Sequence, residues 1–93
     1  MPERLDRVKK LLKARGLEKE YRKYLFTPQN ISLIIRITNE GRIDEAISFT
    51  QKMEQLLYVL KDDLCPSDYD WYVDVVNIIK NAIASSQNKN RIL

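Results

Sequence analysis

The sequence predicts an all-α protein of four or five helices, arranged as a small up-down bundle or as helical hairpins. Three observations predict this class. The 93 residues include only two glycines and three prolines, too few turn residues for a β-sandwich or barrel. Residues that typically start and stop helices flank the apolar segments. Residues 43–64 repeat apolar side chains at alternating spacings of three and four, which is a helical period.

Two helices are expected at the start of the chain, over residues 3–15 and 17–25. The apolar residues of the first recur at helical spacing up to Leu12, and Gly16 follows as a typical helix-ending residue. The sequence leaves open whether Gly16 separates two helices or only bends one.

A third helix is expected over residues 28–39. Thr27 is a suitable N-cap, and Pro28 suits the first helical position, where a missing N–H costs nothing. The apolar residues of 31–38 also alternate as they would in a strand. An α+β fold with strands at 31–38 and 71–79 is therefore the alternative to the all-α fold.

The fourth helix is expected over residues 42–62 and carries the clearest pattern in the chain. Its apolar seam has the a/d spacing of three heptads. Because three heptads are short for an independent coiled coil, we expect packing within the chain, with some contact between subunits. The seam consists of Ile43, Ala46, Thr50, Met53, Leu57, Leu60 and Leu64.

A loop at 62–67 is expected to lead into a fifth helix over 68–85, with Ser67 as its cap. Residues 1–86 are then a single helical domain. The polar residues 87–93 are expected to form a frayed C-terminal tail.

Part of this pattern resembles a known family. Leu33-Ile34, the run from Gly41 to Ala46, and Lys52-Met53 resemble the middle of a tetratricopeptide or pentatricopeptide repeat, over residues 33–57. The resemblance implies a helical hairpin with Gly41 in the turn and Ala46 as the small packing residue. No second copy follows at the repeat period and Thr50 replaces an aromatic residue, so family membership is not inferred.

Composition excludes several kinds of chemistry. The chain has no histidine, which removes imidazole acid–base catalysis and imidazole metal sites, and its single Cys65 rules out an intrachain disulfide. No stretch has the length and apolarity of a membrane span, and the charged N-terminal residues do not resemble a secretory signal. We expect a cytoplasmic protein with no cofactor, metal or small-molecule substrate, and no enzymatic activity.

Charge is distributed unevenly within a net charge of +3. Residues 1–23 carry nine Lys or Arg and four Asp or Glu, whereas residues 40–74 carry three and nine. These segments can attract each other, within one chain or between two. The basic segment also offers cations interleaved with tyrosines, as nucleic-acid binders do. Its candidate nucleic-acid contacts are Lys9, Lys10, Lys13, Arg15, Lys19, Arg22 and Lys23.

Two further sets have ordinary structural interpretations. The carboxylates of Asp62, Asp63, Asp68, Asp70 and Asp74 lack the glycine and glutamate of a calcium loop, so they are interpreted as acids favoured near a helix start. Cys65 lies among these acids, which disfavour a reactive thiolate, and is interpreted as structural or incidental.

Three rings in four residues mark a candidate interaction surface. Tyr69, Trp71 and Tyr72 cannot all enter a small core, so one or two are expected at the surface or in a contact with another chain. The predicted function is a small helical interaction or regulatory module whose partner is itself, as a homodimer, or another protein. Nucleic-acid binding is the alternative. The candidate interaction surface comprises Tyr69, Trp71, Tyr72, Met53, Leu57 and Leu60.

Overall fold

The protein is all-α, as predicted. A computed structural model describes the backbone of residues 2–92 and the side chains of residues 3–87, and this part of the chain contains no strand. Its elements in chain order are α1 (Pro2–Ala14), α2 (Glu18–Tyr21), the 3₁₀ turn η1 (Arg22–Tyr24), α3 (Pro28–Asn39), α4 (Ile43–Leu60) and α5 (Pro66–Ile92). The segments 31–38 and 71–79 lie inside α3 and α5, so the α+β alternative is wrong.

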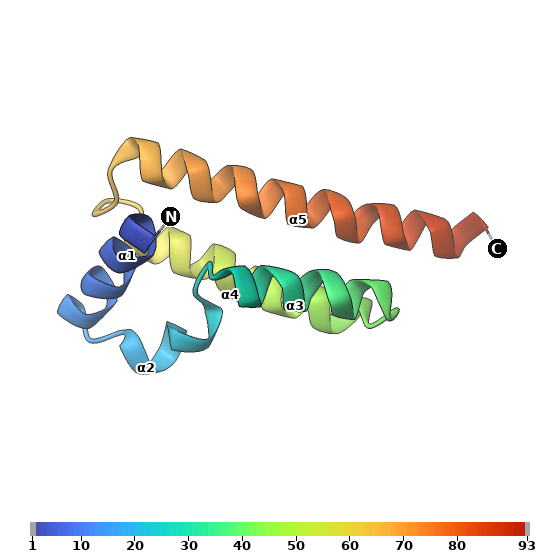
Figure 1. Ribbon diagram of the computed structural model, residues 1–93, viewed down its shortest axis with the longest axis horizontal. Helices are drawn as coiled ribbons and strands as arrows, with labels where there is room; N and C mark the ends of the chain where they lie inside the picture. The colour runs from blue at the N-terminus through green and yellow to red at the C-terminus, as the bar shows by residue number, and fades with distance from the viewer. Residues whose placement is uncertain (1, 93) are drawn as a thin grey trace.

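Helices α3, α4 and α5 pack against one another as an up-down three-helix unit (Figure 1). Helices α3 and α5 run in the same direction, and α4, which lies mostly behind α3 in this view, runs in the opposite direction. The N-terminal elements α1, α2 and η1 lie at the end where α5 begins. The result is elongated, with extents of 48 × 25 × 20 Å.

Local signals in the sequence set the start of α3. The Thr27 side chain accepts a hydrogen bond from the Asn30 backbone N–H at 3.0 Å, and Pro28 occupies the first turn. Asn30 in turn donates its side-chain amide to the Leu25 carbonyl at 2.6 Å, which closes the turn that leads into the helix. The predicted cap is therefore confirmed.

Both glycines end helices. Gly16 and Gly41 have φ values of +70° and +83°, in the left-handed region that glycine adopts without steric cost. After Gly16, the Leu17 N–H reaches back to the Leu12 carbonyl at 2.9 Å, and after Gly41 the Arg42 N–H makes the equivalent 2.9 Å bond. This is the Schellman arrangement. Gly16 therefore separates two helices, α1 and α2, and does not merely bend one.

The heptad seam of α4 faces the chain's own core. Ala46, Thr50 and Met53 are buried against α3 and α5, and Leu57 and Leu60 continue the seam toward α1. The packing within the chain is therefore as expected. The predicted helical hairpin is also present, because α3 and α4 pack against each other across the Gly41 turn.

The predicted bounds differ from the observed ones at three places. The segment 17–25 divides into α2 and η1. Helix α5 begins at Pro66 rather than after Ser67, because the Cys65 carbonyl accepts the first helical hydrogen bond, from the Tyr69 N–H. Its backbone continues to Ile92, past the predicted end at 85, because no glycine or proline follows to stop it. The side chains of the predicted tail, from 88 onward, lie outside the described residues.

Within residues 2–92 there is no helix with the combination of length and apolarity that crossing a lipid bilayer requires.

Candidate interaction surfaces

The six predicted interaction residues do not lie together on the surface. Met53, Leu57 and Leu60 are buried in the core, and Tyr72 is buried against Phe26 with 4.8 Å between ring centroids. These four side chains are therefore not accessible to a partner of the folded chain.

The two remaining residues, Tyr69 and Trp71, lie on different sides of α5, because positions two residues apart on a helix are rotated by about 200°. Tyr69 is half-buried in a groove beside α4, and Trp71 is 37% exposed. Three rings in four residues do not all fit inside, as expected, because consecutive helical positions are rotated by about 100°.

A different set of residues forms the apolar surface of the molecule. On α5, Trp71, Val75, Ile78 and Ala82 follow one another at spacings of four, three and four, which places them along one side of the helix. On α3, Ile31 and Ile35 lie one turn apart. Ile78 is 68% exposed and Ile35 is 45% exposed. These six residues are called the α3–α5 face.

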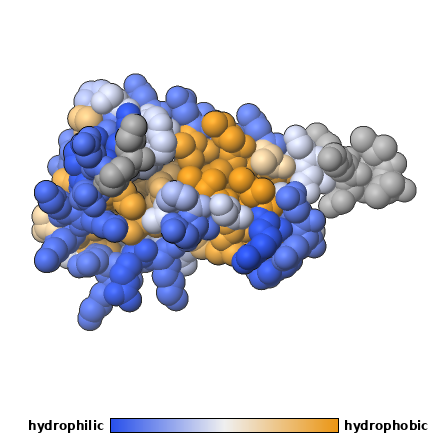
Figure 2. Space-filling view, in the orientation of Figure 1, coloured by the Kyte–Doolittle hydropathy of each residue, from blue (hydrophilic) through white to orange (hydrophobic). Residues whose placement is uncertain are grey.

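A hydrogen bond fixes the register that brings the two stripes together. The Ser86 hydroxyl donates to the Thr38 carbonyl at 3.4 Å. Ile35 and Ala82 each lie one turn before this bond, and Ile31 and Ile78 lie two turns before it. Figure 2 shows the resulting continuous hydrophobic area where α5 runs beside α3. The area lies on the broadest side of the molecule, which Figure 2 views directly.

Few charges border the α3–α5 face. On α3 its exposed neighbours are Ser32 and Asn39, and on the C-terminal half of the α5 stripe they are Asn81 and Ser85. The charged neighbours lie toward the Trp71 end. Asp74 occupies the next position around α5, and the Arg4 guanidinium lies 5.0 Å from the Trp71 ring centroid. A surface of this composition resembles the centre of a protein–protein interface, where charged residues are depleted.

The apolar spacing that forms this surface is present in the sequence, but it overlaps the spacing of the residues that enter the core. Val75 and Ala82 also fit the broad apolar stripe of residues 72–83 that enters the core. Ile78 falls outside that stripe, and its exposure becomes evident only when α3 and α4 are placed around α5. Ile35 was masked in the same way by the buried Ile34 beside it.

The opposite side of α5 carries a second, more polar groove. Tyr58, which is 79% exposed, lines it together with Tyr69 and Val73. The groove has a volume of about 450 Å³, and its other lining residues include Glu54, Gln55 and Asn77. Charged and amide groups therefore interrupt its apolar surface.

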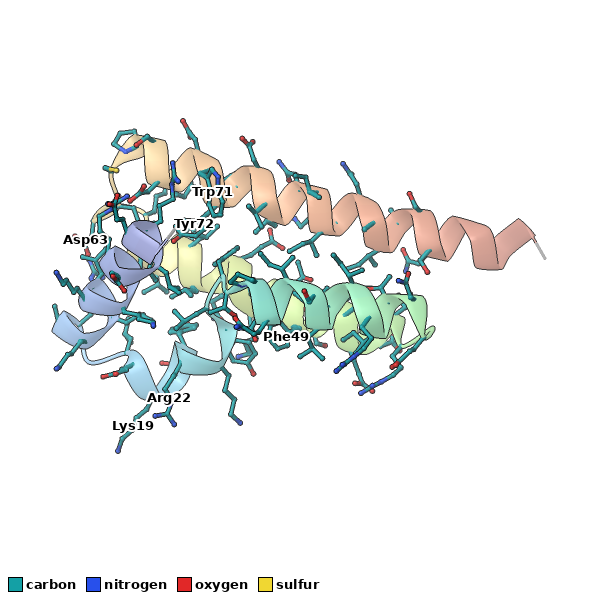
Figure 3. The ribbon with its side chains drawn as sticks, viewed as in Figure 1. Lys19, Arg22, Phe49, Asp63, Trp71 and Tyr72 are labelled. Atoms are coloured by element: carbon teal, nitrogen blue, oxygen red, sulfur yellow. The ribbon has the colours of Figure 1, made fainter. Side chains whose placement is uncertain are left out.

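The basic residues of the N-terminal segment gather at one end of the molecule. Lys19 and Arg22 point away from the helical body (Figure 3). Of the seven candidate nucleic-acid contacts, Arg15 forms an ion pair with Asp63. The remaining six pair with no carboxylate of the described residues; they are Lys9, Lys10, Lys13, Lys19, Arg22 and Lys23.

A shallow pocket of about 370 Å³ separates α1 from α2 at this basic end. Lys9 and Arg22 line it above an apolar floor of Leu12 and Leu25. Glu18 also lines the pocket, and its carboxylate offsets part of the positive charge there.

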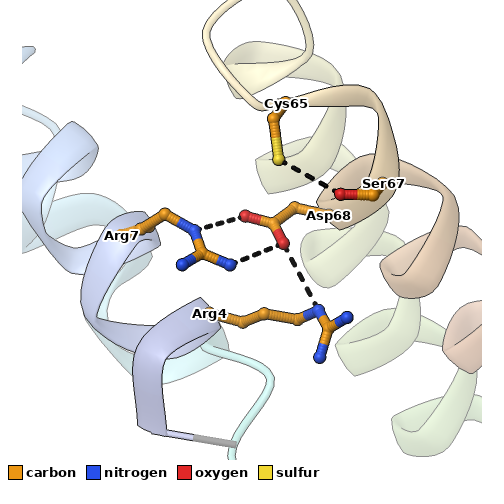
Figure 4. Close-up of polar contacts among 5 residues, drawn as sticks. All are labelled: Arg4, Arg7, Cys65, Ser67 and Asp68. Atoms are coloured by element: carbon orange, nitrogen blue, oxygen red, sulfur yellow. Dashed lines mark hydrogen bonds and ion pairs between the residues drawn. The ribbon is translucent and has the colours of Figure 1, made fainter.

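The attraction between the basic and acidic segments is realised within one chain. Asp68 on α5 is 2% exposed and accepts two hydrogen bonds from the Arg7 guanidinium, at 2.6 and 2.8 Å (Figure 4). The Arg4 Nε lies 3.3 Å from the same carboxylate. Two arginines of α1 are thus fixed to the first turn of α5.

These contacts shift pKa values within the cluster formed by Asp68, Arg4, Arg7 and the neighbouring Tyr72. The Arg7 hydrogen bonds lower the pKa of Asp68 below its ordinary value, against an opposing effect of burial. The same pairing raises the pKa of Arg7, so both groups stay charged at neutral pH. Burial raises the pKa of Tyr72 to about 12. The cluster therefore holds charges in place rather than supplying a proton.

The acidic residues do not assemble a metal site. Among the described residues, no group of three or more Asp, Glu or Cys side chains is placed to hold a metal ion. Asp68 faces Arg7, and Asp63 pairs with Arg15. Cys65 is exposed, with its thiol 3.4 Å from the Ser67 hydroxyl.

Comparison of the chain with protein-family models, with curated proteins and with solved structures finds no match in any of the three.

Proposed function

We propose that this protein is a small, non-enzymatic interaction module that forms a homodimer through the α3–α5 face. One observation carries the proposal. Ile78 is 68% exposed, and Ile35, one turn further along the neighbouring helix, is 45% exposed; both belong to a continuous apolar area on the broadest side of the molecule. A contiguous apolar area bordered by polar residues is characteristic of surfaces that bind other proteins.

The energetics of such a face favour a partner. Burying an isoleucine side chain contributes roughly 1.5–3 kcal/mol relative to leaving it in water. In a symmetric pair the contribution counts twice, because each copy buries the same residues. A small single domain also leaves a thin stability margin, which association increases.

The features that accompany this face are those of a binding protein. The ionisable groups with shifted pKa values belong to ion pairs or buried rings. Two of these groups, Arg42 and Glu45, line a surface pocket of about 800 Å³ beside α4, where they form an ion pair with each other. The exposed Cys65 thiol suits a reducing compartment such as the cytoplasm.

Replacement of one side chain on the face tests the proposal. We expect Ile78→Ser to weaken dimerisation at least tenfold, measured by light scattering during size-exclusion chromatography over a range of concentrations. Tyr58→Ser is the matched control, because it removes from α4 a side chain that is more exposed than Ile78 and lies at the groove on the opposite side of α5. Loss of the dimer in the Tyr58 variant, or its persistence at unchanged affinity in the Ile78 variant, would contradict the assignment of the face.

A second candidate function is nucleic-acid binding at the basic end. It is supported by the six exposed cations on α1, α2 and η1 that pair with no described carboxylate. Cations in such a group attract phosphates with an affinity that falls steeply as salt increases.

Fluorescence anisotropy with a labelled oligonucleotide tests this second candidate. Binding at about 50 mM salt should weaken by orders of magnitude at about 200 mM. The triple variant Lys9/Lys10/Lys13→Glu should abolish it, whereas Lys52→Glu on α4 should not. Absence of binding at low salt, or equal loss in both variants, would eliminate this candidate.

A further inference from the structure

The α5 part of the α3–α5 face tapers along the helix. Trp71 is its largest side chain, Val75 and Ile78 are intermediate, and Ala82 is small. Ser85 continues the stripe at the next spacing of three and is smaller than any aliphatic residue before it. One end of the stripe is therefore bulky, and the other is nearly flat.

We propose that two copies pair with their α5 helices antiparallel, about a two-fold axis that passes beside Ile78. This inference rests on the proposed homodimer and specifies its geometry. Antiparallel pairing about Ile78 sets Trp71 of one copy against Ser85 of the other, because each lies seven residues from the axis. Val75 and Ala82, which lie three and four residues from the axis, meet at the next turn toward the centre. Each bulky residue then faces a small one, which fills the interface evenly.

Parallel pairing would leave the two helices mismatched. It would set Trp71 against Trp71 at one end and Ala82 against Ala82 at the other. The two tryptophans would force the helices apart, and the two alanines would leave a gap. Close packing tolerates neither bulk nor voids without a cost in free energy.

Charge favours the same orientation. Asp74 borders the stripe on its bulky half, and in a parallel pair it would approach Asp74 of the second copy. Antiparallel pairing places it beside the uncharged Asn81 instead. It also places the two basic ends at opposite ends of the pair, and the molecule is 48 Å long. Like charges are then separated by more than the screening length of about 8 Å in physiological salt.

Helix α3 completes the interface. Ile31 lies level with Ile78, because both residues are two turns before the bond between Ser86 and Thr38. The axis that crosses α5 at Ile78 therefore also passes beside Ile31. A layer of two parallel helices then packs on an identical layer that runs the opposite way, which is the arrangement of a four-helix bundle.

Disulfide cross-linking tests the orientation. In a Cys65→Ser background, which removes the native thiol, Ile78→Cys should form a covalent dimer under mild oxidation. A chain with Trp71→Cys should cross-link to a differently tagged chain with Ser85→Cys. It should not cross-link to itself, because the 1.5 Å rise per residue places the two 71 positions about 20 Å apart along the axis. A disulfide needs Cα atoms within about 7 Å.

A milder pair and a control accompany these variants. Val75→Cys with Ala82→Cys tests the same register without removing the tryptophan. Tyr58→Cys, on the other side of α5, should give no covalent dimer above the random level. Light scattering of each reduced variant reports whether the dimer itself has formed.

The outcomes separate the geometry from the proposed function. Cross-linking of 71 with 85, or of 75 with 82, supports the antiparallel pair. Self-cross-linking at 71, or a dimer by light scattering that fails to cross-link at 78 and in both mixed pairs, overturns the geometry and leaves the homodimer standing. A monomer in every variant and in the unmodified chain overturns both.

Discussion

Asp68 joins two parts of the chain that are separated by 61 positions in the sequence. Its position near a helix start identified it as an acid favoured by the helix dipole, and that interpretation accounts for its place at the start of α5. The sequence does not show that α1 delivers Arg7 and Arg4 to the same carboxylate. The pairing is a property of how α1 crosses α5, which no local pattern encodes.

Replacing Asp68 should therefore cost more than replacing an exposed acid nearby. We expect Asp68→Ala to lower the free energy of unfolding by roughly 1–3 kcal/mol, because Arg7 loses its hydrogen-bond acceptor and Arg4 loses the carboxylate with which it forms an ion pair. Urea denaturation followed by circular dichroism measures the change. Asp70→Ala, at an exposed position two residues on, is the control and should have little effect. Equal effects would show that the cluster does not stabilise the fold.

The lowered pKa of Asp68 also predicts a dependence on pH. In the unfolded chain this carboxyl takes up a proton near its ordinary pKa of 3.8, whereas in the folded chain it remains ionised to lower pH. The stability that the cluster supplies is complete above that ordinary value and is lost as the pH falls from there toward the folded pKa. Between pH 7 and pH 3, Asp68→Asn should therefore lose less stability than the unmodified chain. Equal losses of stability in the variant and the unmodified chain, measured by urea denaturation, would contradict this role.

At the scale of the elements, short-range signals predicted the helix ends that depend on neighbouring residues. Thr27 and Pro28 start α3, and Gly41 ends it, because capping and left-handed φ values are set within a few residues. The predicted start of α5, at residue 68, is wrong by two residues. Pro66 takes the first helical position there, as Pro28 does in α3, so the same rule applied to Cys65-Pro66 would have found it.

The Gly41 turn gives a prediction at this scale. A Cβ at this position would meet nothing within 4 Å, so substitution there acts only through the backbone conformation. We expect Gly41→Ala to destabilise the fold by about 1–2 kcal/mol, because an alanine tolerates a φ of +83° poorly. Gly41→Asn should cost less, since asparagine adopts left-handed φ values more readily. Thermal unfolding checks both variants, and equal costs would contradict a backbone origin.

The candidate site was harder to predict than the elements. The a/d seam of α4 was the strongest apolar pattern in the sequence, and the fold uses Met53, Leu57 and Leu60 of that seam for the core. The α3–α5 face depends on which sides of two helices the third leaves uncovered. That choice is made by tertiary packing, so a stripe of four residues on α5 did not stand out from the core stripe beside it.

The molecule as a whole is a three-helix unit with one apolar side and one basic end. The apolar side lies along α3 and α5, and the basic end lies on α1, α2 and η1. The two features involve different residues, so they can be altered separately. Variants at Ile78 should leave the basic end intact, and charge reversals on α1 should leave the face intact.

Association should couple to stability. Because a dimer that forms only from folded chains is favoured at high concentration, the midpoint of thermal unfolding should rise with protein concentration. The rise should disappear in Ile78→Ser and persist in Tyr58→Ser. Calorimetry over a hundredfold range of concentration measures it, and a midpoint independent of concentration in the unmodified chain would contradict the dimer.

The most direct test of the central claim is sedimentation equilibrium of the unmodified chain at increasing concentration, in low and in high salt. The proposed dimer predicts an average mass that rises from 11.0 kDa toward twice that value, with an affinity that salt does not reduce, because the interface is apolar. A mass that stays at 11.0 kDa up to high micromolar concentration would contradict it. A dimer that dissociates as salt is added would contradict it equally, since that dimer would be held by the charged surfaces instead.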